Sequence, residues 1–235
     1  MSKLPMLLLC IVLAVLPAAI VVSEPWAPRN EVFDRLRLGG YVIVLRHGAT
    51  SSDVASKDPM SNPARKASAE RQLSEQGRAQ ADMIGKAMRQ LWIPVSSVMT
   101  SPLQRAVDTG TLLGFGKVVV NPDLAEVGPA VAPDENNRRA EALRKLVEWH
   151  QAGDGNLVIV THKPNVVEAF GKDWADLREG EASVFEPDFA GMGYRLIGRI
   201  QADQWSAPVK ASGDDEPEPE ICGPRVRQAF SPHFD

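Results

Sequence analysis

At 235 residues, with 44% hydrophobic and 24% charged side chains, the chain has the composition of a globular protein with one sizeable core. A formal net charge of −4 excludes a broadly basic surface for nucleic acid, so any positive potential must be local. The cysteines, Cys10 and Cys222, lie near the two ends of the chain, which leaves the part between them without an internal disulfide.

The N-terminal segment has the pattern of a secretory signal peptide over residues 1–23. One lysine is followed by residues 4–22 without any charge, and small residues end the segment at Ser23. The alternative is an uncleaved anchor, because the apolar stretch approaches the roughly 20 residues that span a bilayer. Both interpretations predict an exported domain, periplasmic or secreted, and membrane contact only where the segment is uncleaved.

Residues 24–205 are predicted to form one α/β domain, a three-layer sandwich with a mostly parallel central sheet flanked by helices. A short helix at 30–38 leads into the strand Tyr41–Leu45, whose β-branched run is typical of a strand buried on both faces. Residues 49–71 read as a long loop, and residues 206–235 as an acidic, proline-rich tail.

The remaining elements alternate between strand and helix, as a parallel sheet requires. Ser74 is expected to cap a helix that ends near Leu91, and Ser101 is a candidate cap for the helix that carries Arg105. Further helices are predicted at 135–151 and from Lys163 to Gly171, and further strands at 95–100, 117–121, 156–161, 181–186 and 194–200.

Two histidines and two arginines fall at strand ends or at the helix starts beside them: Arg46, His47, Arg105 and His162. In open α/β sheets, ligands bind beyond the carboxyl ends of the strands. Guanidinium groups bind phosphate oxygens bidentately, and a neutral imidazole can attack phosphorus. A carboxylic acid such as Glu126, in a turn after the 117–121 strand, can protonate the leaving oxygen.

These residues stand in motifs that resemble the histidine phosphatase superfamily, also called phosphoglycerate mutase-like. The similarity spans roughly residues 41–200. Several motifs in the right order are far more specific than a lone Arg-His-Gly. The matching segments are Leu45–Gly48, Arg71–Gln80, Ser101–Thr109, Leu124–Glu126, Val160–His162 and Gly180–Pro187.

The resemblance implies a role for each site residue. His47 is the phosphorylated nucleophile, Arg46, Arg105 and His162 form the phosphate pocket, and Glu126 donates a proton and later activates water. No metal and no organic cofactor is implied. Thr50 stands where the branch of acid phosphatases and phytases has arginine, which favours the mutase-type branch; a phosphate contact and ordinary loop capping are equally good interpretations of Thr50.

The chain departs from the family pattern in three places. Asp53 replaces a phosphate-contacting asparagine, and a carboxylate there repels the ligand unless it points away or meets a cation. Lys163 replaces the glycine common after the second histidine. The usual tryptophan-containing pattern after Glu126 is missing, so Asp53 and Glu135 stay as alternative acids.

The sequence therefore predicts an exported phosphomonoester hydrolase that acts through a phosphohistidine on a small phosphomonoester or a phosphorylated envelope sugar. One alternative is a phosphoglycerate mutase-type phosphotransferase, which the expected export disfavours. A phosphohistidine protein phosphatase is disfavoured by the long loop after His47. A third alternative, a module that binds phosphorylated glycans without turnover, depends on Asp53.

Overall fold

The computed structural model describes residues 29–51, 71–150, 155–188 and 193–206. The predicted signal peptide, Asp53 and the tail from residue 207 onward lie outside these ranges. Within them, no helix combines the length and apolar character needed to cross a bilayer.

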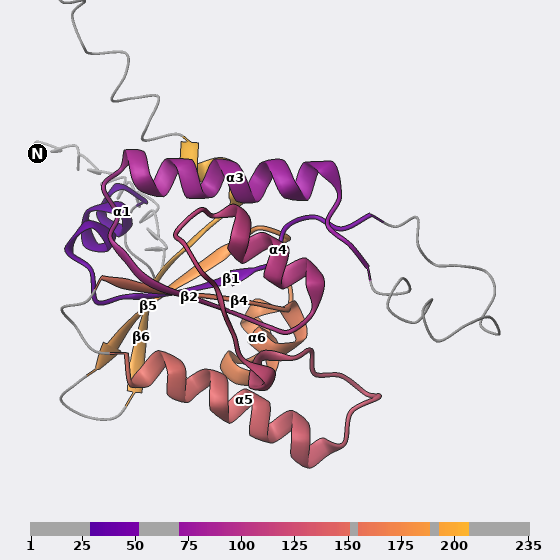
Figure 1. Ribbon diagram of the computed structural model, residues 1–235. Coiled ribbons are helices and arrows are strands. Elements are labelled where there is room, and N and C mark those ends of the chain that lie inside the picture. The colour runs from indigo at the N-terminus through magenta and orange to yellow at the C-terminus, as the bar shows by residue number, and fades with distance from the viewer. Residues whose placement is uncertain (1–28, 52–70, 151–154, 189–192, 207–235) are drawn as a thin grey trace, which may run out of the picture.

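A six-stranded mixed sheet forms the centre of the domain (Figure 1). Its strand order is β3-β2-β4-β1-β5-β6. The four strands from β3 to β1 pair in parallel, and the hairpin of β5 and β6 adds two antiparallel strands at the other edge. This is the predicted sandwich with a mostly parallel sheet. The strands are β1 Val42–Arg46, β2 Val95–Thr100, β3 Val119–Val120, β4 Asn156–Thr161, β5 Ala182–Asp188 and β6 Gly193–Ile200.

Helices cover both faces of this sheet (Figure 1). One face packs against α1, α3 and α4, and the other against α5 and α6. Short 3₁₀ turns lie at 122–124, 172–174 and 202–206. The helices are α1 Arg29–Leu38, α3 Glu75–Gln90, α4 Gln104–Leu112, α5 Pro133–Glu148 and α6 Lys163–Phe170.

The two central strands are buried on both sides, as their apolar runs predict. Ile43 and Leu45 of β1 belong to the core beneath α3, whereas Val42 and Val44 belong to the core beneath α5. All four side chains are 0% exposed. Because side chains alternate along a strand, such a run leaves no polar residue until the strand ends, and Arg46 and His47 come there.

Two sequence-based expectations need correction. The strand expected at 117–121 is only Val119–Val120, an edge strand whose side chains are both 48% exposed. Ser101 does not cap the helix that follows it, because α4 begins later and Leu103 is its N-cap residue. Ser74 does cap α3, and its hydroxyl accepts a hydrogen bond from Gly77 N.

Candidate active site

Strand register brings the two histidines together. Adjacent parallel strands β1 and β4 pair Arg46 with Thr161, so the next residues, His47 and His162, both follow at the same edge. The backbone N–H of His47 also donates to Thr161 O at 3.1 Å. The two imidazole centroids lie 5.3 Å apart, and both residues are almost completely buried.

Hydrogen bonds define the tautomer of His47. Its Nδ1 lies 2.8 Å from the carbonyl oxygen of Gly48, which can only accept, so the proton is on Nδ1. Nε2 is then a lone-pair acceptor, and the Nε–H of Arg105 donates to it at 3.2 Å. Burial lowers the pKa of His47 to about 3, and nearby Arg105 and Arg46 add to this effect against the opposing bond to Gly48. The imidazole is therefore neutral and has a lone pair at Nε2, as the predicted role of nucleophile requires.

His162 is held in the complementary tautomer by Ser101. The hydroxyl of Ser101 lies 2.7 Å from Nε2 of His162 and accepts from Leu103 N at 3.2 Å, which leaves its own proton available to donate to the ring. The proton of the neutral ring is then on Nδ1, a buried atom without a hydrogen-bond partner among the described residues. Burial lowers the pKa of His162 to about 2, with contributions from Arg105 and His47. His162 thus offers one unused neutral donor.

Arg46 presents one edge of its guanidinium to the same site. Nη1 donates to Leu177 O at 2.7 Å and Nη2 to Glu179 Oε1 at 3.3 Å. Nε is buried and has no partner among the residues that the structure describes. Since buried N–H groups are almost always paired, unused donors on Arg46 and His162 indicate a place for an acceptor, such as a phosphoryl oxygen.

Arg105 connects the nucleophile to the predicted acid. It projects from the first turn of α4, is 3% exposed, and places Nη2 2.7 Å from Glu126 Oε2 while Nε contacts His47. The Glu126 side chain keeps 34% of its surface exposed, so it lies at the mouth of the site. One guanidinium thereby contacts both the predicted nucleophile and the predicted proton donor.

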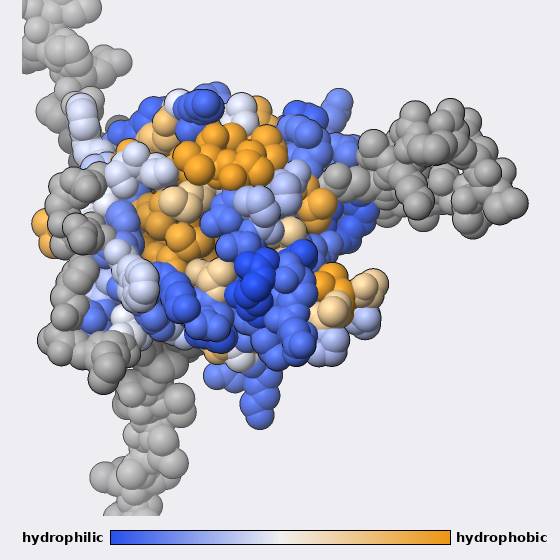
Figure 2. Space-filling model, turned by 60° about the horizontal axis from the view of Figure 1, so that its bottom comes forward, coloured by the Kyte–Doolittle hydropathy of each residue, from blue (hydrophilic) through white to orange (hydrophobic). Residues whose placement is uncertain are grey.

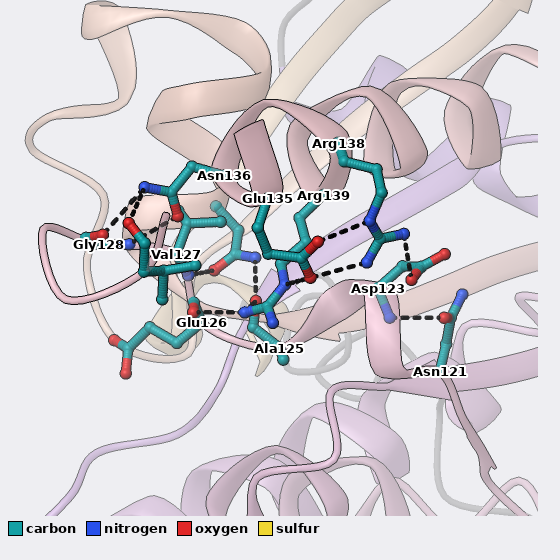
Figure 3. A network of polar contacts seen from close by, with 12 residues as sticks. Asn121, Asp123, Ala125, Glu126, Val127, Gly128, Glu135, Asn136, Arg138 and Arg139 are labelled. Carbon is teal, nitrogen blue, oxygen red and sulfur yellow. Dashed lines mark hydrogen bonds and ion pairs between the residues drawn. The ribbon is translucent and has the colours of Figure 1, made fainter. Parts of the chain in front are cut away.

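The loop that carries Glu126 is fixed by side chains from two helices (Figure 3). Asn165 of α6 donates to Ala125 O at 2.9 Å and accepts from Val127 N at 3.3 Å, so it holds the residues on both sides of Glu126. Arg139 of α5 donates to Glu126 O at 3.0 Å, and Asn136 bonds the backbone of Gly128 twice. The backbone on both sides of Glu126 is therefore held in place by hydrogen bonds from α5 and α6.

The other candidate residues fall in different places. Glu135, an alternative acid, lies on α5, where Arg138 and Arg139 hold both of its carboxylate oxygens and lower its pKa to about 2, which disfavours it as a proton donor. Thr50 is at the site and donates to Glu179 Oε1 at 3.1 Å. Lys163 begins α6 and is partly buried. Asp53 lies outside the described residues.

Several residues at the site carried no prediction of their own role. The sequence pattern places Ser101 at a helix start and Asn165 within the predicted helix from Lys163 to Gly171, and it indicates no function for Glu179. Arg71, in a segment noted only for its resemblance, contributes positive charge that helps to lower the pKa of both His47 and His162. Arg71, Ser101 and Asn165 each lie within or next to a recognised motif, which is the only signal that could have found them.

Two hollows flank the domain. One, of about 430 Å³, lies between the Glu126 loop and the start of α6. The other, of about 550 Å³, lies on the α5 side, where Figure 2 shows hydrophobic patches set among hydrophilic ones. The first is lined by Val127, Gly128, Asn136, Lys163 and Pro164 among others, and the second by Met99, Lys145, Leu146, Trp149 and Leu157 among others. Among the described residues, no cluster of histidine, cysteine or carboxylate side chains is placed to hold a metal ion.

Two neutral histidines and two arginines at one sheet edge define the site of a phosphoryl-transfer protein. The model of the histidine phosphatase superfamily (branch 1) matches residues 42–132, which include His47, Arg105 and Glu126. Over this part of the chain, the sequence is similar to the histidine phosphatase superfamily. An uncharacterised protein of Picosynechococcus sp. is 26% identical over 147 residues, which are 63% of this chain and 80% of the relative.

Solved structures also resemble the chain. A mutant of phosphoserine phosphatase from Entamoeba histolytica, in complex with phosphoserine, has a TM-score of 0.49 at 13% identity, over 70% of this chain and 98% of its own. Mycobacterial glucosyl-3-phosphoglycerate phosphatase has a TM-score of 0.46 at 22% identity, and the match covers 66% of this chain and 96% of that protein. The protein histidine phosphatase SixA, complexed with tungstate, has a TM-score of 0.46 at 19% identity, and the match covers 69% of this chain and 97% of that protein.

Proposed function

We propose that this protein is an exported phosphomonoester hydrolase that works through a phosphohistidine on His47. The match of residues 42–132 to the histidine phosphatase superfamily model supports phosphatase or phosphotransferase activity. The observation that carries the proposal further is the locked His47 tautomer, which aims a neutral Nε2 at the site while Arg105 and His162 surround it. An imidazole held this way needs no general base before it attacks phosphorus.

In the proposed reaction, the phosphoryl group binds to the unused donors of Arg46 and His162 and to Arg105. Nε2 of His47 attacks phosphorus as the ester oxygen leaves, and the cations stabilise charge on the equatorial oxygens. Glu126 protonates the leaving oxygen. Because Glu126 lies 2.7 Å from Nη2 of Arg105, a phosphoryl group bound to Arg105 brings the leaving oxygen close to the carboxyl group.

Water completes the cycle. After the alcohol departs, Glu126 is ionised and accepts a proton from a water molecule that attacks the phosphohistidine, which releases inorganic phosphate and restores His47. A mutase-type enzyme shares every step up to the phosphohistidine and then returns the phosphoryl group to an alcohol. The two activities therefore differ only in the acceptor.

The experiment that tests the function follows the fate of the phosphoryl group. The full chain is incubated with phosphorylated sugars and nucleotides, with and without an excess of the free alcohol. The hydrolase proposal predicts stoichiometric inorganic phosphate and little labelled ester formed with added alcohol. Predominant transfer to the alcohol would favour the mutase, and tight phosphate-ester binding without turnover would favour the binding module.

Export belongs to the same proposal and is tested separately. Expressed in a bacterium with its N-terminus intact, the protein is expected outside the cytoplasm with its first residue near position 24. A cytoplasmic protein that retains residues 1–23 would contradict export, without bearing on the reaction.

A further inference from the structure

Glu179 lies in the proposed phosphate pocket, although the proposed reaction gives it no role. Its Oε1 accepts from Nη2 of Arg46 at 3.3 Å and from the hydroxyl of Thr50 at 3.1 Å. Its side chain is 29% exposed, and the Arg46 side chain is 16% exposed. The Glu179 carboxylate thus already contacts Arg46 and Thr50, two residues expected to bind the dianionic phosphoryl group.

The backbone holds Glu179 in this place. The next residue, Gly180, has φ +73°, and its N–H reaches the carbonyl oxygens of Arg46 at 3.2 Å and His47 at 3.0 Å. Arg46 N in turn donates to Glu181 O at 3.0 Å. The segment that carries Glu179 is therefore fastened across the end of β1, next to the nucleophile, rather than free at the surface.

The charges around Glu179 define what the pocket can accept. Arg46 faces it from β1 and Thr50 from the following segment, while Arg71, Glu126 and Glu181 act on Arg46 through their charges. Arg199 neutralises Glu181 in an ion pair of 2.6 Å. Arg105 is paired with Glu126 at 2.7 Å, and both histidines are neutral. Arg46 is in turn paired with Glu179. Among the described charged residues named in this paragraph, Arg71 then supplies the positive charge that remains for a ligand.

The contacts of Arg46 determine which edge of its guanidinium a ligand can reach. Nη1 is taken by Leu177 O, so a ligand enters along the edge formed by Nε and Nη2. Glu179 already holds Nη2. A phosphoryl oxygen on this edge comes next to the carboxylate oxygen, and two such anionic oxygens repel unless one proton lies between them.

We propose that Glu179 makes the pocket select the monoanionic form of the phosphoryl group, whose P–OH donates a hydrogen bond to the Glu179 carboxylate. This inference rests on the proposed function and adds the ionisation state of its substrate. The second pKa of a phosphomonoester is about 6, so the selected form predominates in acid. The neutral histidines fit this assignment, because their low pKa values keep His47 a nucleophile well below pH 6.

The test measures competitive inhibition against pH by two ligands, methylphosphonate and difluoromethylphosphonate, of which the fluorinated one has the lower second pKa. For the wild-type enzyme, the inhibition constant should rise about tenfold per pH unit above each ligand's own second pKa, because the fraction of monoanion falls in that proportion. The pH at which the inhibition constant begins to rise, the break in the profile, should therefore be lower for difluoromethylphosphonate than for methylphosphonate. In Glu179→Gln the rise should be lost and affinity at pH 8 should exceed that of the wild type. Glu141→Gln, which removes the same charge on the exposed side of α5, should behave as the wild type.

Contradictory outcomes separate this inference from the proposed function. A break at the same pH for both ligands, or identical profiles for wild type and Glu179→Gln while turnover persists, would overturn monoanion selection alone. If neither phosphonate inhibits any variant and no phosphate is released, the proposed function fails, and the assignment of Glu179 fails with it.

Discussion

Arg105 donates its Nε–H to Nε2 of His47 at 3.2 Å and, through Nη2, forms an ion pair of 2.7 Å with Glu126. The same guanidinium therefore faces the atom proposed to attack phosphorus and the carboxyl group proposed to protonate the leaving oxygen. The nucleophile and acid follow different strands, and α4 between them supplies the side chain that joins them. Single substitutions of these residues should therefore have different effects on kcat and on stability, which can be measured one at a time.

Removing the acid should affect substrates unequally. Glu126→Gln keeps the size of the side chain but cannot give a proton, so kcat for alkyl phosphates should fall about 10²–10⁴-fold. An aryl phosphate with a good leaving group should lose far less. Steady-state kinetics across a series of leaving groups measures the slope, with Glu141→Gln as the matched surface control. Equal losses along the series would remove Glu126 from the role of acid.

Asn165 should act through Glu126. Asn165→Ala removes the bonds to Ala125 O and Val127 N, which should lower the free energy of unfolding by about 1–3 kcal/mol and release the loop. The loss in kcat should again be greatest for poor leaving groups. Combined with Glu126→Gln, the substitution should add little further loss in kcat, because both affect the same proton transfer. Additive losses would assign Asn165 a structural role only.

The buried neutral histidines should make the fold sensitive to acid. Between pH 6.5 and about 3, the unfolded chain binds protons at His47 that the folded chain excludes, so the free energy of unfolding falls as the pH falls. One such histidine contributes up to about 1.4 kcal/mol per pH unit in this window. Urea denaturation at pH 4–7 should show a shallower dependence in His47→Asn than in the wild type. A wild-type stability that does not change over this range would contradict the neutral state of both rings.

The segment after His47 depends on a close backbone contact. A Cβ on Gly77 would lie 2.0 Å from Ala49 O, a backbone atom that cannot turn away. Gly77→Ala should therefore lower the free energy of unfolding by roughly 1–3 kcal/mol and also reduce turnover, since Ala49 follows the nucleophile closely. Gly193→Ala, whose Cβ meets nothing within 4 Å, is the control and should change stability by about 0.5 kcal/mol at most. Unchanged thermal unfolding of Gly77→Ala would refute the contact.

The central part of the fold could be predicted from the sequence because local pattern and burial agree there. The runs that form β1 and β4 are apolar on both faces, and parallel pairing then puts His47 beside His162. The strand at Val119–Val120 was expected to be longer because its valines suit a strand, yet it lies at the exposed edge, where one partner strand limits pairing.

The less predictable parts of the site depend on contacts that no local pattern contains. Glu179 belongs to a segment before β5 that crosses the end of β1, 133 residues away from Arg46 in the chain. Asn165 contacts Ala125 across 40 residues, although its own helix start was recognised. The tandem arginines look alike in sequence, but only Arg139 turns toward the Glu126 loop, while Arg138 pairs with Asp123 and Glu135 (Figure 3).

The most direct test of the central claim is to trap the phosphorylated enzyme. Rapid quenching into alkali during turnover of a ³²P-labelled phosphomonoester should leave label on the protein that is stable to base, labile to acid, and located by peptide mapping on His47. His47→Asn should carry no label and release no phosphate. Label on any other residue, or phosphate release by His47→Asn at a rate near that of the wild type, would contradict the proposed mechanism.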